Sequence, residues 1–157
     1  MSTFRRGVRL GIDVGRARVG VARCDPDGML AVPVETVPRD EASIARILQI
    51  ASDYDLLEFV VGLPVNLQGT DTPSTTDARE FAAELHRRSG TPVRLVDERL
   101  STVTAHAALR SSGRSQKKSR SIVDQVAAVV LLQQAIDMEK STGNPAGAII
   151  SPDEEHA

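Results

Sequence analysis

The sequence contains very little cysteine and few aromatic residues: one cysteine, no tryptophan, and 3% aromatic residues in all. A single cysteine cannot form an internal disulfide, so a disulfide-stabilised fold is excluded and a reducing compartment is favoured. We interpret this residue, Cys24, as a small buried apolar side chain and not as a reactive thiol. The scarcity of aromatic rings argues against a binding surface built on stacking.

The sequence also lacks a long apolar segment and a net positive charge. The longest apolar run, residues 126–132, is far too short to cross a bilayer. No apolar stretch follows the arginines near the N-terminus, as a secretory signal would require. The formal net charge of -2 and the pI of about 5.9 mean that any basic surface must be local. We therefore expect a cytoplasmic protein that does not bind membranes.

Length and composition are those of one globular domain. The chain has 157 residues, of which 41% are hydrophobic and 25% charged. We expect a short N-terminal extension over residues 1–7 and a single domain over residues 8–140. Residues 141–157 contain glycine, proline and acidic residues, and we expect them to form a flexible C-terminal tail.

Apolar and polar residues alternate from Val8 to Val14, which predicts a strand with two unlike faces. Strands are predicted at 8–14, 17–24, 29–37, 57–64 and 91–98, and helices at 40–54, 75–90, 101–113 and 121–140. Pro33 favours an edge position or a bulge for the third strand. The order predicts an α/β fold: a mixed five-stranded sheet with three antiparallel strands, then βα units, and helices on both faces.

One carboxylate, Asp13, lies inside the first predicted strand, in "VRLGIDVGRARVGVA". Burying an ionised acid is unfavourable unless a cation or hydrogen-bond donors meet it. Asp13 shares its face of the strand with Gly11 and Gly15, which leaves room for a phosphate or a metal ion. The alternative is that Asp13 only accepts hydrogen bonds from the N–H groups of the following turn.

Two more acids, Asp97 and Glu98, end the fifth predicted strand. The carboxyl ends of parallel strands meet at one edge of a sheet, where sites of α/β folds gather. Adjacent residues of a strand point to opposite faces, so only one of the two acids can share the side of Asp13. The alternative is an ion pair between Glu98 and Arg99 that leads into the next helix.

A further acid, Asp124, begins the apolar stripe of the last predicted helix. This stripe consists of Asp124, Ala127, Ala128, Leu131 and Ala135. The small alanines would let the helix lie close to the sheet and bring the carboxylate to its edge. The alternative is that Asp124 belongs to a capping box that starts at Ser121.

Oxygen ligands without histidine or cysteine suit Mg²⁺ or Mn²⁺ and not zinc. Clustered carboxylates repel one another unless cations compensate them, so such a site should depend on metal. Paired Mg²⁺ ions can activate a water and stabilise the leaving oxygen of a phosphodiester. We therefore predict a catalytic and metal-binding set of Asp13, Glu98 and Asp124, with Asp97 beside Glu98 as a further catalytic candidate.

A cluster of basic residues without any acid separates the last two predicted helices. It consists of Arg110, Arg114, Lys117, Lys118 and Arg120. Such a cluster in a chain of net negative charge can hold phosphates next to Asp124, and the alternative is a solvated loop. Asn66, with Gln68 and Gly69, is a further candidate for contact with nucleic acid. With so few aromatic rings, recognition should follow backbone shape more than base identity.

Four segments, in order, resemble the YqgF/RuvX family of bacterial Holliday junction resolvases. They are "LGIDVGRARVGVA", "VVGLP" followed by "NLQG", "PVRLVDERLS" and "DQVAAVVLLQ", and together they span about residues 10–136. The resemblance implies a ribonuclease H-like fold and an Mg²⁺-dependent nuclease site at Asp13, Glu98 and Asp124. It implies a four-way DNA junction, precursor 16S rRNA, or both as substrate. A resolvase that makes paired cuts should act as a two-fold homodimer.

Two other functions fit parts of the sequence. The "GIDVGRARVG" segment also suits the phosphate-binding hairpin of an actin-like nucleotide-binding domain, although a single such domain would supply only half of that site. A non-catalytic nucleic-acid-binding factor would keep the basic cluster without needing the acids. Protection by ATP in a thermal melt would favour the first alternative, and binding without Mg²⁺-dependent cleavage would favour the second.

Overall fold

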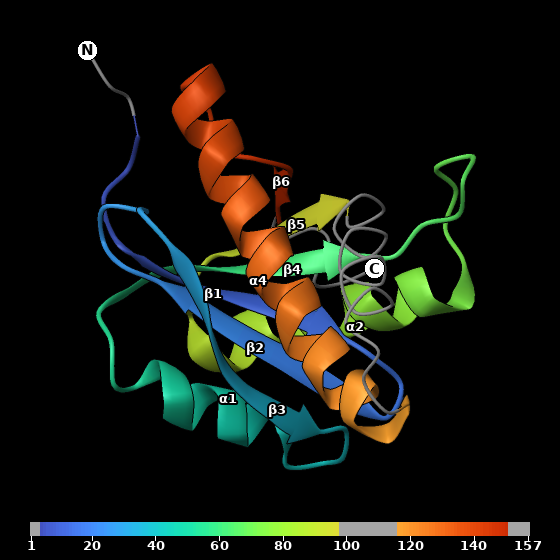
Figure 1. Ribbon diagram of the computed structural model, residues 1–157. Helices are drawn as coiled ribbons and strands as arrows, with labels where there is room; N and C mark the ends of the chain where they lie inside the picture. Colours follow the sequence, from blue (N-terminus) through green and yellow to red (C-terminus); the bar gives the residue numbers. More distant parts are fainter. Residues whose placement is uncertain (1–3, 98–115, 151–157) are drawn as a thin grey trace.

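The computed structural model describes residues 4–97 and 116–150, with side chains from residue 125 onward in the last helix. The strands form one six-stranded sheet in the order β3-β2-β1-β4-β5-β6 (Figure 1). The strands are β1 (Val8–Val14), β2 (Arg18–Cys24), β3 (Ala31–Pro38), β4 (Leu56–Leu63), β5 (Val93–Asp97) and β6 (Ala148–Ile149). The helices are α1 (Ser43–Ala51), α2 (Pro73–Ser89) and α4 (Gln116–Thr142).

The sheet is mixed, as the sequence predicts. β1, β2 and β3 pair antiparallel, whereas β4 pairs parallel to both β1 and β5. The carboxyl ends of β1, β4 and β5 therefore lie at the same edge, which we call the carboxyl edge. The opposite edge, where these strands begin, is the amino edge. Pro33 lies in the edge strand β3, beside a register shift between Val21 and Ala22, which confirms both expectations drawn from this proline.

The sheet has one strand more than the five that we predict. β6 pairs antiparallel with β5 through Arg94–Ile149 and Leu95–Ala148, and the next residue, Ile150, is buried. A strand of two residues is too short to show any periodicity, so the sequence gives no signal for it. These residues belong to the segment that we expect to be a flexible tail, so part of that segment is packed on the sheet.

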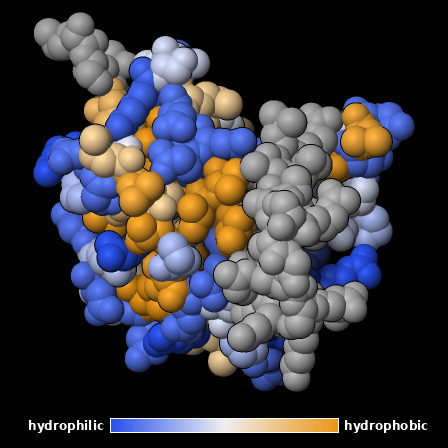
Figure 2. Space-filling view, viewed as in Figure 1, coloured by the Kyte–Doolittle hydropathy of each residue, from blue (hydrophilic) through white to orange (hydrophobic). Residues whose placement is uncertain are grey.

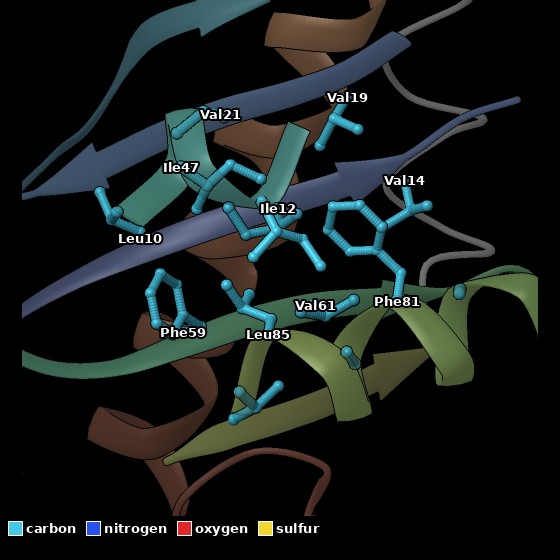
Figure 3. Close-up of a cluster of buried hydrophobic side chains, with 14 of the residues drawn as sticks. Leu10, Ile12, Val14, Val19, Val21, Ile47, Phe59, Val61, Phe81 and Leu85 are labelled. Atoms are coloured by element: carbon cyan, nitrogen blue, oxygen red, sulfur yellow. The ribbon is translucent and has the colours of Figure 1, made fainter. Parts of the chain in front are cut away.

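Helices α1 and α2 cover one face of the sheet. The cluster of buried side chains between them and the strands includes Leu10, Ile12, Val14, Val19, Val21, Ile47, Phe59, Val61, Phe81, Leu85 and Leu95 (Figure 3). Alternate residues of β1 supply this cluster, so Asp13 belongs to the other face. We call the two faces the α1/α2 face and the α4 face.

Helix α4 runs obliquely across the opposite face (Figure 1). Ala127, Ala128, Leu131 and Ala135 are all buried, which confirms the apolar part of the predicted stripe. A Cβ atom on Gly11 would lie 2.9 Å from the carbonyl oxygen of Ala128, so the helix rests directly on β1. Apolar residues also reach the surface over the middle of α4 (Figure 2). None of the described helices combines the length and apolarity needed to cross a membrane.

A buried ion cluster fastens α4 to the sheet near the amino edge. It consists of Arg5, Arg9 on β1, Glu58 on β4, Arg94 on β5 and Glu139 on α4. Glu58 lies 3.1 Å from both Arg5 and Arg94, and Glu139 lies 3.1 Å from Arg9. Both carboxylate side chains are only 3% exposed. The cluster joins three strands, the helix and the N-terminal segment.

Cys24 lies fully buried beneath α4, beside the ion cluster. Its sulfur accepts a hydrogen bond from the backbone N–H of Arg9 at 3.4 Å. Burial raises the pKa of the Cys24 thiol, which keeps it neutral. The interpretation of Cys24 as a buried apolar residue is therefore confirmed.

Candidate active site

Asp13 lies at the carboxyl edge, half-buried near the end of β1 on the α4 face. Four neighbouring positions on this face are glycine, and we call them the glycine ring: Gly11, Gly15, Gly20 and Gly62. Gly20 on β2 pairs directly with Asp13 on β1. Gly62 follows Val61, the partner of Ile12, and so lies beside Asp13 on β4. The carboxylate is thus surrounded by positions that have no side chains.

If Asp13 only accepted hydrogen bonds from its own turn, the turn should explain the glycines around it. The N–H of Gly15 donates to the carbonyl oxygen of Arg18 at 2.8 Å, so the hairpin itself uses this donor. A Cβ atom on Gly15 would lie 2.7 Å from the same oxygen, which explains this glycine by the turn alone. No such turn requires Gly20 or Gly62, which lie on other strands. Their absence of side chains suits a ligand over Asp13.

Asp97 follows the alternation of the other face. It is the exposed last residue of β5 and pairs with Leu63. Leu95 packs in the α1/α2 cluster, whereas Val96 packs beneath α4. A residue two positions after Leu95 continues the α1/α2 face. The backbone thus assigns Asp97 to the α1/α2 face, and Glu98 lies outside the described residues.

Asp124 belongs to α4, although its side chain lies outside the described part. Ala128, which follows it by one helical turn, contacts β1 over Gly11. Gln125, the residue after Asp124, donates from Nε2 to Oγ1 of Thr36 at 2.8 Å. Thr36 pairs with Gly20, and Gly20 pairs with Asp13. This part of α4 therefore crosses the sheet at the level of Asp13.

The predicted ligand set cannot be assembled from described side chains alone. Within residues 4–97 and 125–150, no group of three or more histidine, cysteine, aspartate or glutamate side chains could hold a metal ion. That part of the chain contributes Asp13, a half-buried oxygen donor of the kind that Mg²⁺ and Mn²⁺ prefer. Glu98 and the side chain of Asp124 fall outside it.

Lys117, Lys118 and Arg120 lie in the first turns of α4, which starts at Gln116, and not in the loop that we predict. The segment "QKKSR" has no apolar stripe, so periodicity cannot identify it as helical. Glutamine, lysine and arginine are nevertheless good helix formers. Arg110 and Arg114 lie outside the described residues.

Asn66 uses its side chain to shape the loop between β4 and α2. Its Oδ1 accepts hydrogen bonds from the backbone N–H groups of Gln68 and Thr70, at 3.1 and 2.9 Å. Its Nδ2 donates to Oγ1 of Thr70 at 2.6 Å. The structure therefore gives Asn66 a local role in addition to the substrate contact that we predict.

Arg18 is a candidate that sequence reasoning missed. It begins β2 opposite Gly15, and Val19 and Val21 pack on the α1/α2 face. Arg18 therefore belongs to the α4 face, diagonally across the hairpin from Asp13. The alternation of β2 in the sequence predicts the face on which Arg18 lies. Only the observed register between β1 and β2 places Arg18 next to Asp13.

Arg39 is a second residue that the sequence does not reveal. Its Nη1 donates to the carbonyl oxygen of Gly15 at 2.9 Å, two residues after Asp13. Its guanidinium also binds both carboxylate oxygens of Asp77 on α2, at 2.8 and 2.7 Å, and lies over the ring of Phe81. Arg39 thus holds the β1–β2 hairpin against α2. The partners are too far apart in sequence for any motif to indicate them.

This contact predicts a measurable acid sensitivity. Hydrogen bonds from Arg39 hold the pKa of Asp77 below its ordinary value of 3.8. A lowered pKa stabilises the fold above pH 3.8, and this stabilisation is lost as the pH falls through the folded-state value. Asp77→Asn should therefore lose less stability than the wild type between pH 5 and pH 3, the range about the ordinary pKa of an aspartate. Urea unfolding at both pH values tests this, and identical losses would contradict it.

Comparison with known proteins identifies the family. The family described as "RuvX: Holliday junction resolvase" matches residues 7–138. The chain belongs to the RuvX family. A relative from Clavibacter michiganensis, named "Putative pre-16S rRNA nuclease", is 54% identical over 94% of this chain and 93% of its own length. A relative from Streptomyces coelicolor with the same name is 52% identical over 92% of this chain and 88% of its own length.

A solved structure confirms the fold of this RuvX-family chain. Thermus thermophilus RuvC, in complex with a Holliday junction substrate, superposes with a TM-score of 0.54 over 92% of this chain and 99% of its own. The sequence identity is 16%, so this likeness concerns the fold. The predicted ribonuclease H-like architecture is thereby confirmed, with six strands in place of five.

Proposed function

We propose that this RuvX-family protein is a metal-dependent nuclease that hydrolyses phosphodiester bonds in structured nucleic acid. The observation that carries the proposal is the position of Asp13 inside the glycine ring at the carboxyl edge. Asp13 supplies the oxygen donor that a cation needs, and its neighbours Gly20 and Gly62 carry no side chains that would occupy the place of a phosphate. Membership of a family described as Holliday junction resolvase supports the reaction class.

We assign a role in the proposed reaction to each of these residues. Asp13 would bind the cation from β1, with Glu98 and Asp124 as further ligands. Asp97 follows the alternation of the α1/α2 face, so we propose Glu98 and not Asp97 as the ligand from this pair of acids. Mg²⁺ or Mn²⁺, when bound, would lower the pKa of a water and stabilise the leaving oxygen. Arg18 would attract the phosphate toward Asp13, and Arg39 would keep the hairpin in place.

Two substrates follow from the names of the relatives and of the family: precursor 16S rRNA and a four-way DNA junction. The test incubates the protein with both, side by side, in Mg²⁺ and in EDTA. We expect cleavage of at least one substrate in Mg²⁺ and none in EDTA. Binding of both substrates with cleavage of neither would instead support a non-catalytic nucleic-acid-binding factor. Family membership favours the nuclease over the actin-like nucleotide-binding domain.

Lys117 and Lys118 should contact phosphates from the start of α4. Each phosphate contact contributes about 0.9 to the slope of log affinity against log salt concentration for a duplex. Replacing both lysines with alanine should therefore weaken binding of all sequences alike and flatten the slope by about 2. The matched control is the double alanine variant of Arg87 and Arg88, exposed at the end of α2 near the amino edge. An unchanged slope in the lysine variant would assign these residues to a solvated helix end.

A further inference from the structure

Leu67 is the most exposed large apolar residue among those that the structure describes, with 90% of its surface accessible. It lies at the tip of the loop between β4 and α2, residues 64–72, which projects beyond the end of β4 (Figure 1). A single exposed apolar side chain is ordinary on a protein surface. The shape of the loop and its location are what distinguish this one.

The loop is held in one shape by its own hydrogen bonds. Val65 and Asp71 form a β-bridge at its base, and the N–H of Asn66 donates to the carbonyl oxygen of Thr70 at 3.2 Å. The Asn66 side chain makes three further hydrogen bonds inside the turn. Gly69 has a φ of 80°, which a residue with a side chain rarely adopts. The tip that carries Leu67 is therefore preorganised.

Helix α2 anchors the base of this loop. The Thr75 hydroxyl donates to the carbonyl oxygen of Pro64, and Thr72 and Thr75 form a reciprocal capping box. Arg79 binds Asp71 at 3.1 Å. The base of the loop is thus attached to the first turns of α2.

The loop starts at the carboxyl edge, next to the candidate active site. Gly62 lies beside Asp13, and Leu67 follows it by five residues, which span at most about 18 Å. This upper limit corresponds to roughly five base steps of 3.4 Å. A strand whose phosphate lies over Asp13 would therefore have bases within reach of Leu67.

We propose that Leu67 is a wedge that enters the base stack a few nucleotides from the scissile phosphate. Proteins that distort nucleic acid insert apolar side chains of this kind between bases. An aliphatic wedge also fits a chain with only 3% aromatic residues. Because a base step that is already unstacked opens more easily, Leu67 confers preference for branched or bulged nucleic acid over a continuous duplex. This inference rests on the proposed function.

The test compares Leu67→Ser with Leu67→Met, which keeps an apolar side chain, and with Met29→Ser. Met29 is 73% exposed in the turn between β2 and β3, at the amino edge. The probes are a four-way DNA junction and a bulged RNA hairpin, each carrying 2-aminopurine beside the interruption, and continuous duplexes of both. Binding and fluorescence are measured in Ca²⁺, and cleavage is measured separately in Mg²⁺.

The wild type should raise the fluorescence of 2-aminopurine beside the interruption of one probe. It should also bind that interrupted probe at least tenfold more tightly than the continuous duplex. Leu67→Ser should lose both effects while its affinity for the duplex stays within twofold, and the other two variants should behave as the wild type. The probe that shows both effects, DNA or RNA, is the nucleic acid whose base stack Leu67 enters. Wild-type preference and fluorescence in Leu67→Ser, with cleavage intact, would refute the wedge alone. Failure of the wild type to bind any probe would refute the proposed function as well.

Discussion

Asp13→Asn is expected to reduce phosphodiester cleavage more than about 100-fold, because even residues that only orient metal ligands contribute 10- to 100-fold. Asparagine has nearly the same shape as aspartate but lacks its charge, so it is a poor ligand for a hard divalent cation. Because the two side chains have nearly the same shape and this one is only half-buried, the fold should persist. Binding of nucleic acid, which depends on the basic residues, should also persist.

The matched control is Asp97→Asn, the same chemical change at the same edge of the sheet. Asp97 ends β5 in the alternation of the α1/α2 face, so its loss should change the cleavage rate less than threefold. Single-turnover cleavage, thermal melting and binding are measured for both variants. Wild-type turnover by Asp13→Asn would remove this residue from the catalytic set, and inactivity of Asp97→Asn would return that residue to it.

Glu58→Ala is expected to destabilise the fold by about 3–5 kcal/mol, the range observed when one partner of a buried ion pair is removed. Glu58 is bonded by Arg5 and Arg94 and lies 3.6 Å from Arg9, and its side chain is only 3% exposed. Without it, Glu139 is the one remaining carboxylate of the ion cluster. Three arginines then face one another with a single anion among them.

Thermal melting measures this effect, and the melting temperature should fall by roughly 10 °C for a chain of this size. The control is Glu80→Ala, because Glu80 is exposed on α2 and its loss should change stability by less than about 0.5 kcal/mol. If both variants melt at the wild-type temperature, the ion cluster does not fasten α4 to the sheet. The position of α4 on the sheet would then have to be fixed by apolar packing alone.

Most of the fold can be predicted from the sequence because local patterns determine it. The alternation through Ile12 and Val14 predicts β1 and its buried face, and Pro33 predicts an edge strand. The alanines after Asp124 predict the side of α4 that packs on the sheet. Each of these signals lies within a few residues, where periodicity is informative.

The site is less predictable because its parts come from different strands. The period of β1 reveals Gly11 and Gly15, but Gly20 and Gly62 join the glycine ring only through strand register. Register also places Arg18, and tertiary packing alone creates the ion cluster and the contact between Arg39 and Asp77. The sequence leaves the choice between Asp97 and Glu98 open. Alternation predicts that the two acids point to opposite faces of the sheet, but not which of them shares the face of Asp13.

Calorimetric titration with Mn²⁺ is the most direct test of the claim that Asp13 holds a divalent cation at the carboxyl edge. We expect the wild type and Asp97→Asn to bind Mn²⁺ alike, and Asp13→Asn to bind it at least tenfold more weakly. Equal affinity of Asp13→Asn and the wild type would show that Asp13 does not hold the cation.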